Sequence, residues 1–408
     1  MWQIEHQCPQ CSAPVTLEET ERLFVCPYCR VRLYIASDSV LRYYLPAMPF
    51  QEQIAYVPYW RTKGIQFTCR SSGVTTGVID RTSRAHNSSC FPYSLGVRPQ
   101  VFKLRFVGQT VEKALLPPSV VFKDTSEEMS APVALPDGFA IPDPILFRVA
   151  TREVESLIFS PVRIQGDIIC DAIDGKRLGK KTDDMLSGTP SLDEAQGEVS
   201  FIPTLCPNCG ADLIGEKESV MLFCSNCHLA WKVSGRALHS AHVAFLPGEQ
   251  DALYLPFWCM RVNFEGMDER LFIDPVKTGR LDGLHLYLDD PGFFFWVPAF
   301  KVNPSIFLKL AERATVAQSR LDDVEVGVRK RLYPVTLPAG EAAKLVKVLV
   351  HLLVGKGEGV GPIFTRLTAR ANEPQLYFIP FTSSGYELTQ QKMRMSVLQN
   401  ALKYGKNL

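Results

Sequence analysis

The chain has 408 residues, of which 46% are hydrophobic and 21% are charged, and its formal net charge at pH 7 is +1. This length and balance exclude a disordered chain and allow two or three domains with cores of their own. The small net charge excludes an overall electrostatic attraction to nucleic acid or to an anionic membrane, but it leaves room for a local basic face.

The apolar stretches are too short to cross a membrane. The longest, residues 345–354, is interrupted by Lys347 and His351, whereas a spanning helix needs about 20 predominantly apolar residues. Residues 1–6 lack the charged-then-apolar pattern of a secretory signal. We therefore expect a soluble, cytoplasmic protein without a membrane span.

The chain begins with two Cys-x2-Cys pairs. Cys8 and Cys11 form the first pair, and Cys26 and Cys29 form the second after a spacer of fourteen residues. Two cysteines on one tight turn can direct both sulfurs at one ion, and a second such turn completes a tetrahedron. Four thiolates leave no open coordination position, so the spacing predicts a structural zinc site.

The same arrangement occurs again 198 residues later. Cys206, Cys209, Cys224 and Cys227 repeat both pairs and the spacer. A cytoplasmic location argues against disulfides as the explanation. His228 is an alternative fourth ligand, and iron is an alternative metal because four cysteines can also hold it.

The two cysteine segments, residues 1–36 and 201–236, resemble zinc ribbons, the small β-hairpin modules of transcription factors and rubredoxin-like proteins. The resemblance implies a hairpin fold and one structural zinc ion in each, and it implies no activity. Ser12 follows the first pair where a glycine such as Gly210 is usual, so we expect some strain in that turn. Changing Cys8 or Cys206 to serine is expected to unfold mainly its own ribbon.

Between the ribbons we expect a first body and a linker. Residues 40–70 and 146–164 alternate apolar and polar side chains and predict strands, as do residues 74–79. These segments place an α+β body at residues 37–170. Residues 171–200 are rich in Gly, Lys, Asp and Ser, which predicts a linker.

A second α+β body is predicted at residues 237–386. A hairpin is expected over 284–300, and helices are expected over 303–317 and 341–354. Asn303 followed by Pro304 is typical of a helix start. A third helix is predicted over 387–404, inside a C-terminal segment 387–408, because its apolar residues can share one helix face.

Short motifs also recur in the same order in both halves of the chain. The recurring pairs are 56–60 with 254–258, 102–104 with 300–302, 132–136 with 334–338, and 157–161 with 376–380. The predicted class is therefore α+β with an internal duplication. Each half has a four-cysteine zinc ribbon followed by a mainly antiparallel β body with a few helices.

The sequence contains no recognisable catalytic or nucleotide-binding motif. Residues 174–182 miss the phosphate-loop spacing, and the glycine-rich segment 355–361 follows a helix rather than a strand. The aromatic motifs 56–60, 254–258 and 293–296 are expected in the core rather than at an interface. We leave open whether the chain is an enzyme and lean against it.

The favoured function is a non-enzymatic zinc-binding adaptor or assembly protein that binds protein partners through duplicated surfaces, with oligomerisation allowed. A nucleic-acid-binding ribbon protein is the alternative, and an enzyme with a site between the bodies is a second alternative. The basic residues that nucleic acid would require are Arg22, Arg30, Arg32, Arg61, Lys63, Arg70, Arg81, Arg84, Lys217, Lys232 and Arg236.

Overall fold

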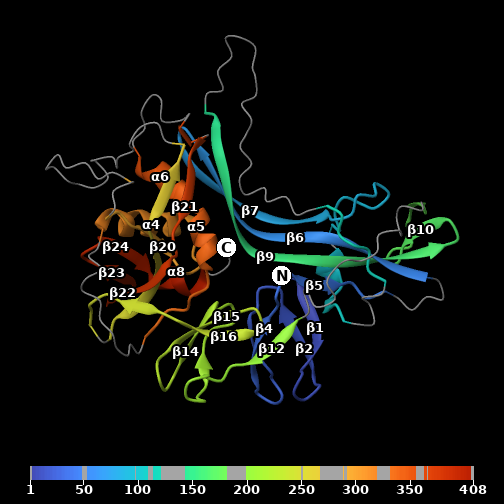
Figure 1. Ribbon diagram of the computed structural model, residues 1–408, viewed down its shortest axis with the longest axis horizontal. Coiled ribbons are helices and arrows are strands. Elements are labelled where there is room, and N and C mark those ends of the chain that lie inside the picture. Colours follow the sequence, from blue (N-terminus) through green and yellow to red (C-terminus); the bar gives the residue numbers. More distant parts are fainter. Residues whose placement is uncertain are drawn as a thin grey trace, which may run out of the picture. The chain divides into compact units, whose positions relative to one another are not determined.

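The computed structural model describes residues 2–47, 53–96, 98–108, 114–120, 143–181, 199–249, 251–266, 288, 292–318, 331–354, 363–364 and 366–405. The chain forms two compact units, both rich in strands, and the longer helices belong to unit 2 (Figure 1). Unit 1 consists of Met1–Lys63, Ile79–Lys123 and Arg152–His239, and unit 2 consists of Gly64–Val78, Asp124–Thr151 and Ser240–Leu408. Both cysteine segments therefore belong to unit 1, so the units do not follow the predicted division into two ribbon-and-body halves.

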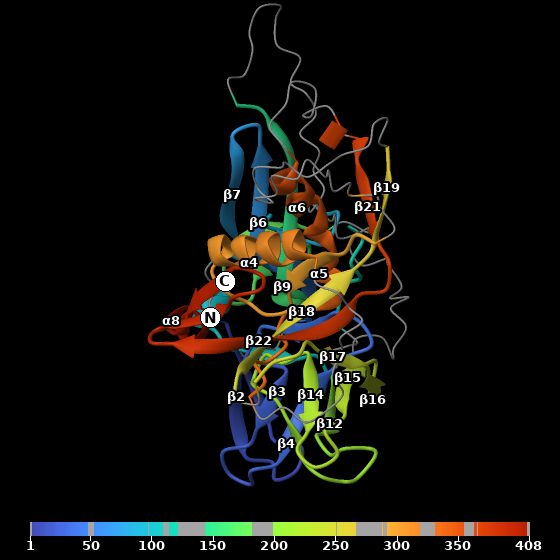
Figure 2. The same ribbon diagram turned by 90° about the vertical axis from the view of Figure 1, so that its left-hand side faces the viewer.

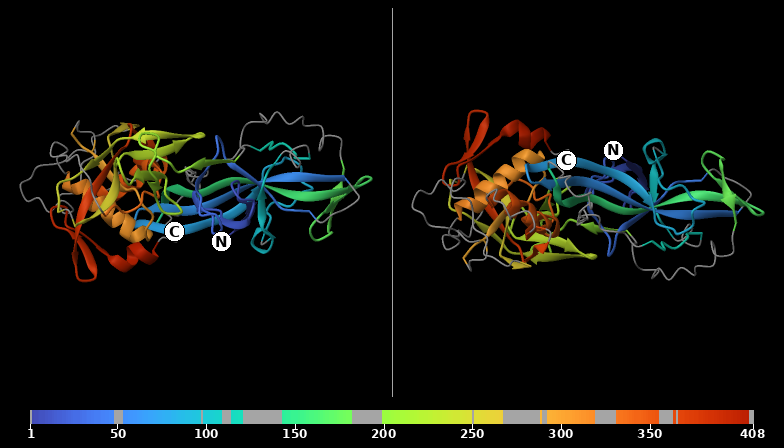
Figure 3. Two further views of the ribbon diagram at one scale, coloured as in Figure 1. Left: turned by 90° about the horizontal axis from the view of Figure 1, so that it is seen from below. Right: turned by 90° about the horizontal axis from the view of Figure 1, so that it is seen from above.

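The main sheet of unit 1 is built from short strands and three long ones. Its strands are β1 (Gln3–Gln7), β2 (Pro14–Glu18), β5 (Leu41–Tyr44), β6 (Gln53–Arg70), β7 (Gly73–Arg84), β8 (Leu104–Phe106), β9 (Ile145–Gln165), β10 (Ile168–Asp171) and β11 (Arg177–Lys180). The order is β11-β10-β9-β5-β8-β1-β2, and β6 pairs with both β9 and β7. The long strands β7, β6 and β9 lie side by side (Figure 3) and contribute residues to both units.

Two smaller sheets of unit 1 contain the cysteine hairpins. Their strands are β3 (Leu23–Val25), β4 (Arg32–Ala36), β12 (Ser200–Pro203), β13 (Leu213–Ile214), β14 (Met221–Cys224), β15 (Ala230–Ser234) and β16 (Ala237–Ala241). The strand orders are β12-β4-β3 and β13-β14-β15-β16. Cys26 and Cys29 lie in the turn between β3 and β4, while Cys224 ends β14 and Cys227 lies in the turn between β14 and β15. Cys8 and Cys11 lie in the turn between β1 and β2 of the main sheet. The segments therefore contain β-hairpins, as the resemblance to zinc ribbons implies. A short helix, α1 (Arg98–Val101), precedes β8.

The predicted linker 171–200 is partly sheet. β10 ends at Asp171, β11 pairs with it, and β12 begins at Ser200. Residues 182–198 lie outside the described part of the chain. Within residues 171–181, the Gly, Lys and Asp residues belong to a hairpin, because those residue types also favour turns.

The core of unit 1 includes two of the cysteine ligands. Cys8 and Cys26 are fully buried in one apolar cluster with Ile4, Tyr59 and Ile158. Burying apolar surface is the main favourable term in folding. The first hairpin is therefore part of the unit's core, not a module that hangs from it.

One charged side chain lies inside this core. Arg61 on β6 is fully buried and forms a two-pronged pair with Glu19, at 2.9 and 3.1 Å. It also contacts Asp80 on β7 at 2.7 Å, and its guanidinium lies 3.8 Å from the centre of the Trp2 ring. Buried ions need paired partners of this kind, and here the pair joins the cysteine hairpin segment to the long strands.

Unit 2 has a six-stranded sheet covered by helices. Its elements are β17 (Val243–Phe245), β18 (Leu253–Met260), β20 (Phe295–Pro298), β22 (Gln375–Ser384), β23 (Glu387–Gln390), β24 (Met395–Leu398), the separate pair β19 (Val262–Glu265) and β21 (Thr368–Ala371), and the helices α4 (Pro304–Ala317), α5 (Ala339–Lys344), α6 (Val346–Leu353) and α8 (Gln399–Tyr404). The order is β20-β18-β22-β23-β24, with β17 on β22. The helix α4 packs on β20 and α6.

Two of the predicted helices are confirmed. Asn303 caps α4 by accepting a hydrogen bond from the Ser305 N–H at 3.0 Å, and Pro304 is its first residue. The predicted helix 341–354 consists of α5 and α6 with a break at Leu345. The hairpin predicted over 284–300 falls largely outside the described residues, which include its second strand as β20.

The predicted helix over 387–404 is wrong. Residues 387–390 and 395–398 are the strands β23 and β24, and only residues 399–404 are helical, as α8. Met395 and Val397 are buried, while Leu398, which the helix prediction placed on the apolar face, is 51% exposed. Burial of alternate residues is typical of a strand. The leucines and the methionine of this segment are also spaced so that they fit one helix face, and this spacing led to the helix prediction.

The repeated Tyr-x-Pro-aromatic-Trp motifs make matching hydrogen bonds in the two units. The carbonyls of Tyr56 and Tyr254 accept from the N–H groups of Leu116 and Tyr333, both at 2.9 Å. The carbonyls of Pro58 and Pro256 accept from the N–H groups of Ala85 and Ala299, both at 2.9 Å. The indole N–H groups of Trp60 and Trp258 donate to the carbonyls of Val120 and Leu337, at 2.8 and 2.9 Å. Val120 thus corresponds to Leu337, and Ala85 to Ala299. In the sequence, the motif at residues 102–104 matches 300–302, and the motif at 132–136 matches 334–338. The hydrogen bonds give a different alignment of the two halves at these places. Residues 132–136 lie outside the described part of the chain.

The strands that follow also match. The three-strand meander β9-β10-β11 resembles β22-β23-β24 in order and in antiparallel pairing. Each first turn contains a glycine with positive φ, 57° at Gly166 and 61° at Gly385. Glycine adopts this conformation without the Cβ penalty of other residues. The hairpin missed at 387–398 is therefore the counterpart of the one at 168–180.

Candidate metal centres

The four Cys-x2-Cys turns share one backbone conformation. In each turn, the residue four positions after the first cysteine has a positive φ; these are Ser12 (59°), Arg30 (61°), Gly210 (75°) and His228 (61°). The N–H groups of Ser12, Arg30 and Gly210 donate to the carbonyls of Cys8, Cys26 and Cys206, at 2.8, 3.0 and 2.8 Å. The left-handed conformation costs a serine more than a glycine, which agrees with the strain expected at Ser12.

The turns bring the eight predicted cysteines together as two tetrads. In each tetrad all four sulfurs lie within 4.8 Å of one another. In the first, Sγ–Sγ distances are 3.8 Å for Cys8–Cys29 and 3.8 Å for Cys11–Cys26. In the second, they are 3.5 Å for Cys206–Cys227 and 3.4 Å for Cys209–Cys224.

These separations fit a tetrahedral ion. A zinc–sulfur bond of about 2.3 Å places the corners of a regular tetrahedron about 3.8 Å apart. The first tetrad has this spacing, and the second is slightly tighter. A disulfide needs sulfurs about 2.05 Å apart, and all twelve cysteines are free thiols. Each tetrad is therefore positioned to bind one metal ion.

Backbone amides favour the thiolate form that a metal requires. In the second tetrad, the Ala211 N–H lowers the pKa of Cys209 to about 6, and the Leu229 N–H lowers the pKa of Cys227. The N–H groups of Asn226 and Cys227 also lie 3.4 and 3.3 Å from the Cys224 sulfur. Burial acts in the opposite sense and raises the pKa of Cys206 to about 11. A cation held between the sulfurs would supply the countercharge that the buried thiolate needs.

The alternative ligand and the remaining cysteines stand apart from the tetrads. His228 is exposed at its left-handed turn position, and the second cluster consists of cysteines alone. Cys69, Cys170 and Cys259 are buried, and Cys90 is partly buried. Burial raises the pKa of Cys69 to about 12 and raises that of Cys259 further, so these thiols behave as small apolar side chains.

The two hairpins are joined to each other, which the sequence did not predict. β12 pairs antiparallel with β4, so that the strand entering the second cysteine segment extends the sheet of the first (Figure 2). The N–H groups of Arg22 and Leu23 both donate to the Lys217 carbonyl, at 2.7 and 2.8 Å. Lys217 also pairs with Glu21 at 2.7 Å.

A shared apolar core lies between the hairpins. Leu23, Tyr34 and Ala36 of the first hairpin cluster with Cys206 and Cys224 of the second tetrad; the other buried members are Leu213, Leu222 and Trp231. Two cysteines of the second tetrad therefore belong to a core that is shared with the neighbouring hairpin. The two tetrads belong to one structural body.

Several basic residues that nucleic acid would need are already engaged. Arg61 is buried, and Lys63 pairs with Glu153 at 2.6 Å. Arg236 pairs with Asp38 at 2.8 Å, and Arg84 donates to the Phe91 carbonyl at 2.6 Å. Carboxylate partners offset the positive potential that phosphate contacts depend on.

The repeated aromatic motifs lie in the cores. Tyr59, Tyr254 and Phe257 are buried on β6 and β18, and Phe295 and Trp296 are buried on β20. Their burial supports the prediction that these residues belong to the core and argues against a role at an interface. The glycine-rich segment 355–361 lies outside the described residues.

No family model matches this chain, and neither a curated protein nor a solved structure shows detectable similarity to it. Within the described part of the chain, no helix is both long enough and apolar enough to cross a membrane.

Proposed function

We propose that the two tetrads hold structural zinc ions and that the chain is a non-enzymatic adaptor or assembly protein. The observation that carries the proposal is the pair of four-cysteine clusters with sulfur spacings suited to a tetrahedral ion. Four thiolates use all the positions of such an ion, so it has none left for a substrate or a reactive water. Its role is then to stabilise the unit that contains it.

Exposed apolar side chains on the hairpins support a protein partner. On the first hairpin, Val25 is 49% and Tyr28 is 64% exposed; on the second, Leu205, Ile214 and Leu229 are also exposed. Tyr28 and Leu229 lie in or beside the cysteine turns, which a bound ion would hold rigid. Rigid aromatic and aliphatic side chains bind partners at a low cost in conformational entropy.

The matched hydrogen bonds support the inference that the chain is an internal duplication. Three pairs of bonds and a three-strand meander recur in the same order in the two units. A duplicated chain offers two related surfaces, which suits an adaptor that joins two similar partners.

Metal analysis tests the first part of the proposal. The purified chain is expected to carry two zinc ions, measured by inductively coupled plasma mass spectrometry. Cys11→Ser and Cys209→Ser change one exposed ligand of each tetrad and should each reduce the content to one. Iron in place of zinc, or a metal content unchanged in both variants, would contradict it.

A pull-down from host lysate tests the second part. The tagged chain is compared with Tyr28→Ser, and with Tyr93→Ser as a control that is equally exposed but lies outside the hairpins. Partners that survive nuclease and are lost only with Tyr28→Ser support an adaptor. Partners lost together with nucleic acid would favour the nucleic-acid alternative.

A further inference from the structure

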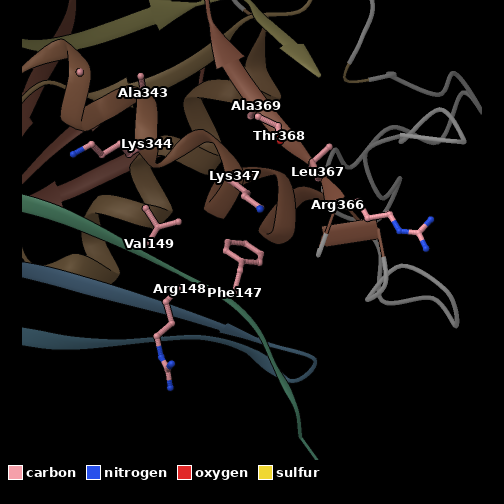
Figure 4. Close-up of a pocket in the computed structure, with 11 residues that line it drawn as sticks. Phe147, Arg148, Val149, Ala343, Lys344, Lys347, Arg366, Leu367, Thr368 and Ala369 are labelled. Atoms are coloured by element: carbon pink, nitrogen blue, oxygen red, sulfur yellow. The ribbon is translucent and has the colours of Figure 1, made fainter. Parts of the chain in front are cut away.

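Unit 2 contains a hollow of about 260 Å³ that is unrelated to the tetrads. Four segments surround it: the start of β9, the helix α5, the helix α6, and residues 366–369, which lead into β21 (Figure 4). Phe147, Val149, Ala343 and Leu367 give the hollow an apolar wall. No cysteine of either tetrad contributes to it, so an occupant would be independent of the metal ions.

All the charged residues that line this hollow are positively charged. Four of its eleven lining residues, Arg148, Lys344, Lys347 and Arg366, are cationic, and none of the eleven carries a carboxylate. Glu341, beside the hollow, pairs with Lys344 at 2.8 Å, so part of this positive charge is offset. Cationic side chains on the lining of one hollow raise the positive potential there, and this potential favours the binding of an anion.

Lys347 faces an aromatic ring of the hollow. Its ammonium lies 4.9 Å from the centre of the Phe147 ring, and Figure 4 shows the two side chains facing each other. Phe147 itself is fixed, because its ring stacks on Phe364 at 5.6 Å and meets the edge of His351 at 5.9 Å. The guanidinium groups of Arg148 and Arg366 extend outward at the rim (Figure 4), and both side chains are long enough to turn over a bound ligand.

We propose that this hollow binds a small phosphate-bearing anion. A lysine supplies a point charge to phosphate, and an arginine supplies paired N–H donors that match its oxygens. Cations on four separate segments suit a group with several charged oxygens better than a single carboxylate. The volume lies just below the range of drug-sized ligands, which suits free phosphate, pyrophosphate or a small phosphorylated molecule.

Calorimetric titration of the full-length, metal-loaded chain tests this proposal. The probes are inorganic phosphate and pyrophosphate, with sodium chloride at equal ionic strength as the blank. Binding tighter than about 1 mM, the weak end of ordinary metabolite affinities, is expected for at least one probe. If only pyrophosphate binds, the natural ligand carries more than one phosphoryl group; if phosphate binds equally, one group is enough.

Matched variants assign the binding to the hollow. Lys347→Gln should weaken binding about tenfold or more, the change expected for loss of one charge-assisted hydrogen bond. Arg366→Gln, at an exposed rim position, should weaken it less and provides the readout if Lys347→Gln does not fold. Lys309→Gln, an exposed residue of α4 outside the hollow, should leave it unchanged. Absence of binding to both probes, or an equal loss with Lys309→Gln, would overturn the proposal.

Discussion

The hydroxyl of Tyr34, on the first cysteine hairpin, donates a hydrogen bond to the carbonyl of Ser219, on the second, at 3.1 Å. The two residues are 185 positions apart in the sequence, and both are buried. Around this bond lie the shared apolar core and the pairing of β12 with β4. The two candidate metal centres are therefore parts of one folded body, and the effects of metal binding at one should reach the other.

Tyr34→Phe tests how much the joining bond contributes. The ring and its packing stay, but the Ser219 carbonyl loses a buried donor, so we expect unit 1 to lose about 1 kcal/mol of unfolding free energy. Denaturant titration of the metal-loaded chain measures the loss. Tyr28→Phe, on an exposed ring of the same hairpin, serves as the control and should be neutral. A loss equal to that of the control would show that water replaces the bond.

Alkaline pH should destabilise unit 1 through a second tyrosine. Burial, with a smaller contribution from the charge of Glu19, raises the pKa of Tyr43 above its usual value. The folded state thus favours the neutral phenol. Its contribution to stability is complete below about pH 10, the ordinary tyrosine pKa, and is lost as the pH rises through the folded value. Melting temperatures from pH 8 to 11 should fall more gently in Tyr43→Phe than in the wild type, and an identical fall would contradict this.

Loss of a ligand in the second tetrad should disturb the first hairpin as well. The sequence suggested that a cysteine change would unfold mainly its own ribbon, but Cys206 belongs to the same buried cluster as Leu23 and Tyr34. We expect Cys206→Ser to speed amide hydrogen exchange in β3 and β4 in addition to its own hairpin. Cys209→Ser removes a ligand of the same ion at an exposed position and should affect β3 and β4 less.

Exchange that increases only within residues 204–236 in both variants would show that the hairpins open independently. The same measurement after chelation provides a check with the wild-type chain. Removing both ions should unfold unit 1 as a whole. The apparent binding energy of a structural zinc ion, about 10–16 kcal/mol, is comparable to the unfolding free energy of a whole domain.

Breaking the buried pair of Arg61 and Glu19 should destabilise unit 1 more than breaking a surface ion pair does. Arg61→Met leaves a buried carboxylate without its partner, which typically costs about 3–5 kcal/mol. Arg105→Met breaks an exposed pair with Glu5 at 3.1 Å and should cost about 0–1 kcal/mol. The double variant Arg61→Met/Glu19→Gln removes the unpaired charge and should recover part of the loss. Equal effects of the two single variants would contradict the assignment.

Much of the candidate metal site could be predicted from the sequence because its information is local. The spacing within residues 8–29 and 206–227 determines which sulfurs can reach one ion, and the eight predicted cysteines do form two tetrads. Helix α4 could also be predicted from the sequence, because Asn303 and Pro304 specify its start. In both cases a few neighbouring residues contain the whole signal.

The joining of the hairpins depends on contacts between residues far apart in the chain. Nothing near Tyr34 in the sequence indicates that its hydroxyl will donate a hydrogen bond to the Ser219 carbonyl. The charge of Arg61 suggested a surface position, although Glu19 and Trp2 enclose it. The C-terminal hairpin was missed for another reason. A spacing that fits one helix face also fits two short strands joined by a turn, and only the matching meander at β9-β10-β11 separates the two.

A single substitution should relieve backbone strain in the first cysteine turn and stabilise unit 1. Ser12 has φ of 59°, and the corresponding Gly210 has φ of 75°. Serine is strained in this left-handed region by about 1 kcal/mol, whereas glycine is not. We expect Ser12→Gly to raise the melting temperature of unit 1 slightly and Gly210→Ser to lower it, with two ions bound in both. Added flexibility of glycine in the unfolded chain reduces the gain, so the opposite signs of the pair, rather than their size, are the test. A decrease in both variants would mean that the Ser12 side chain stabilises its turn more than its backbone strains it.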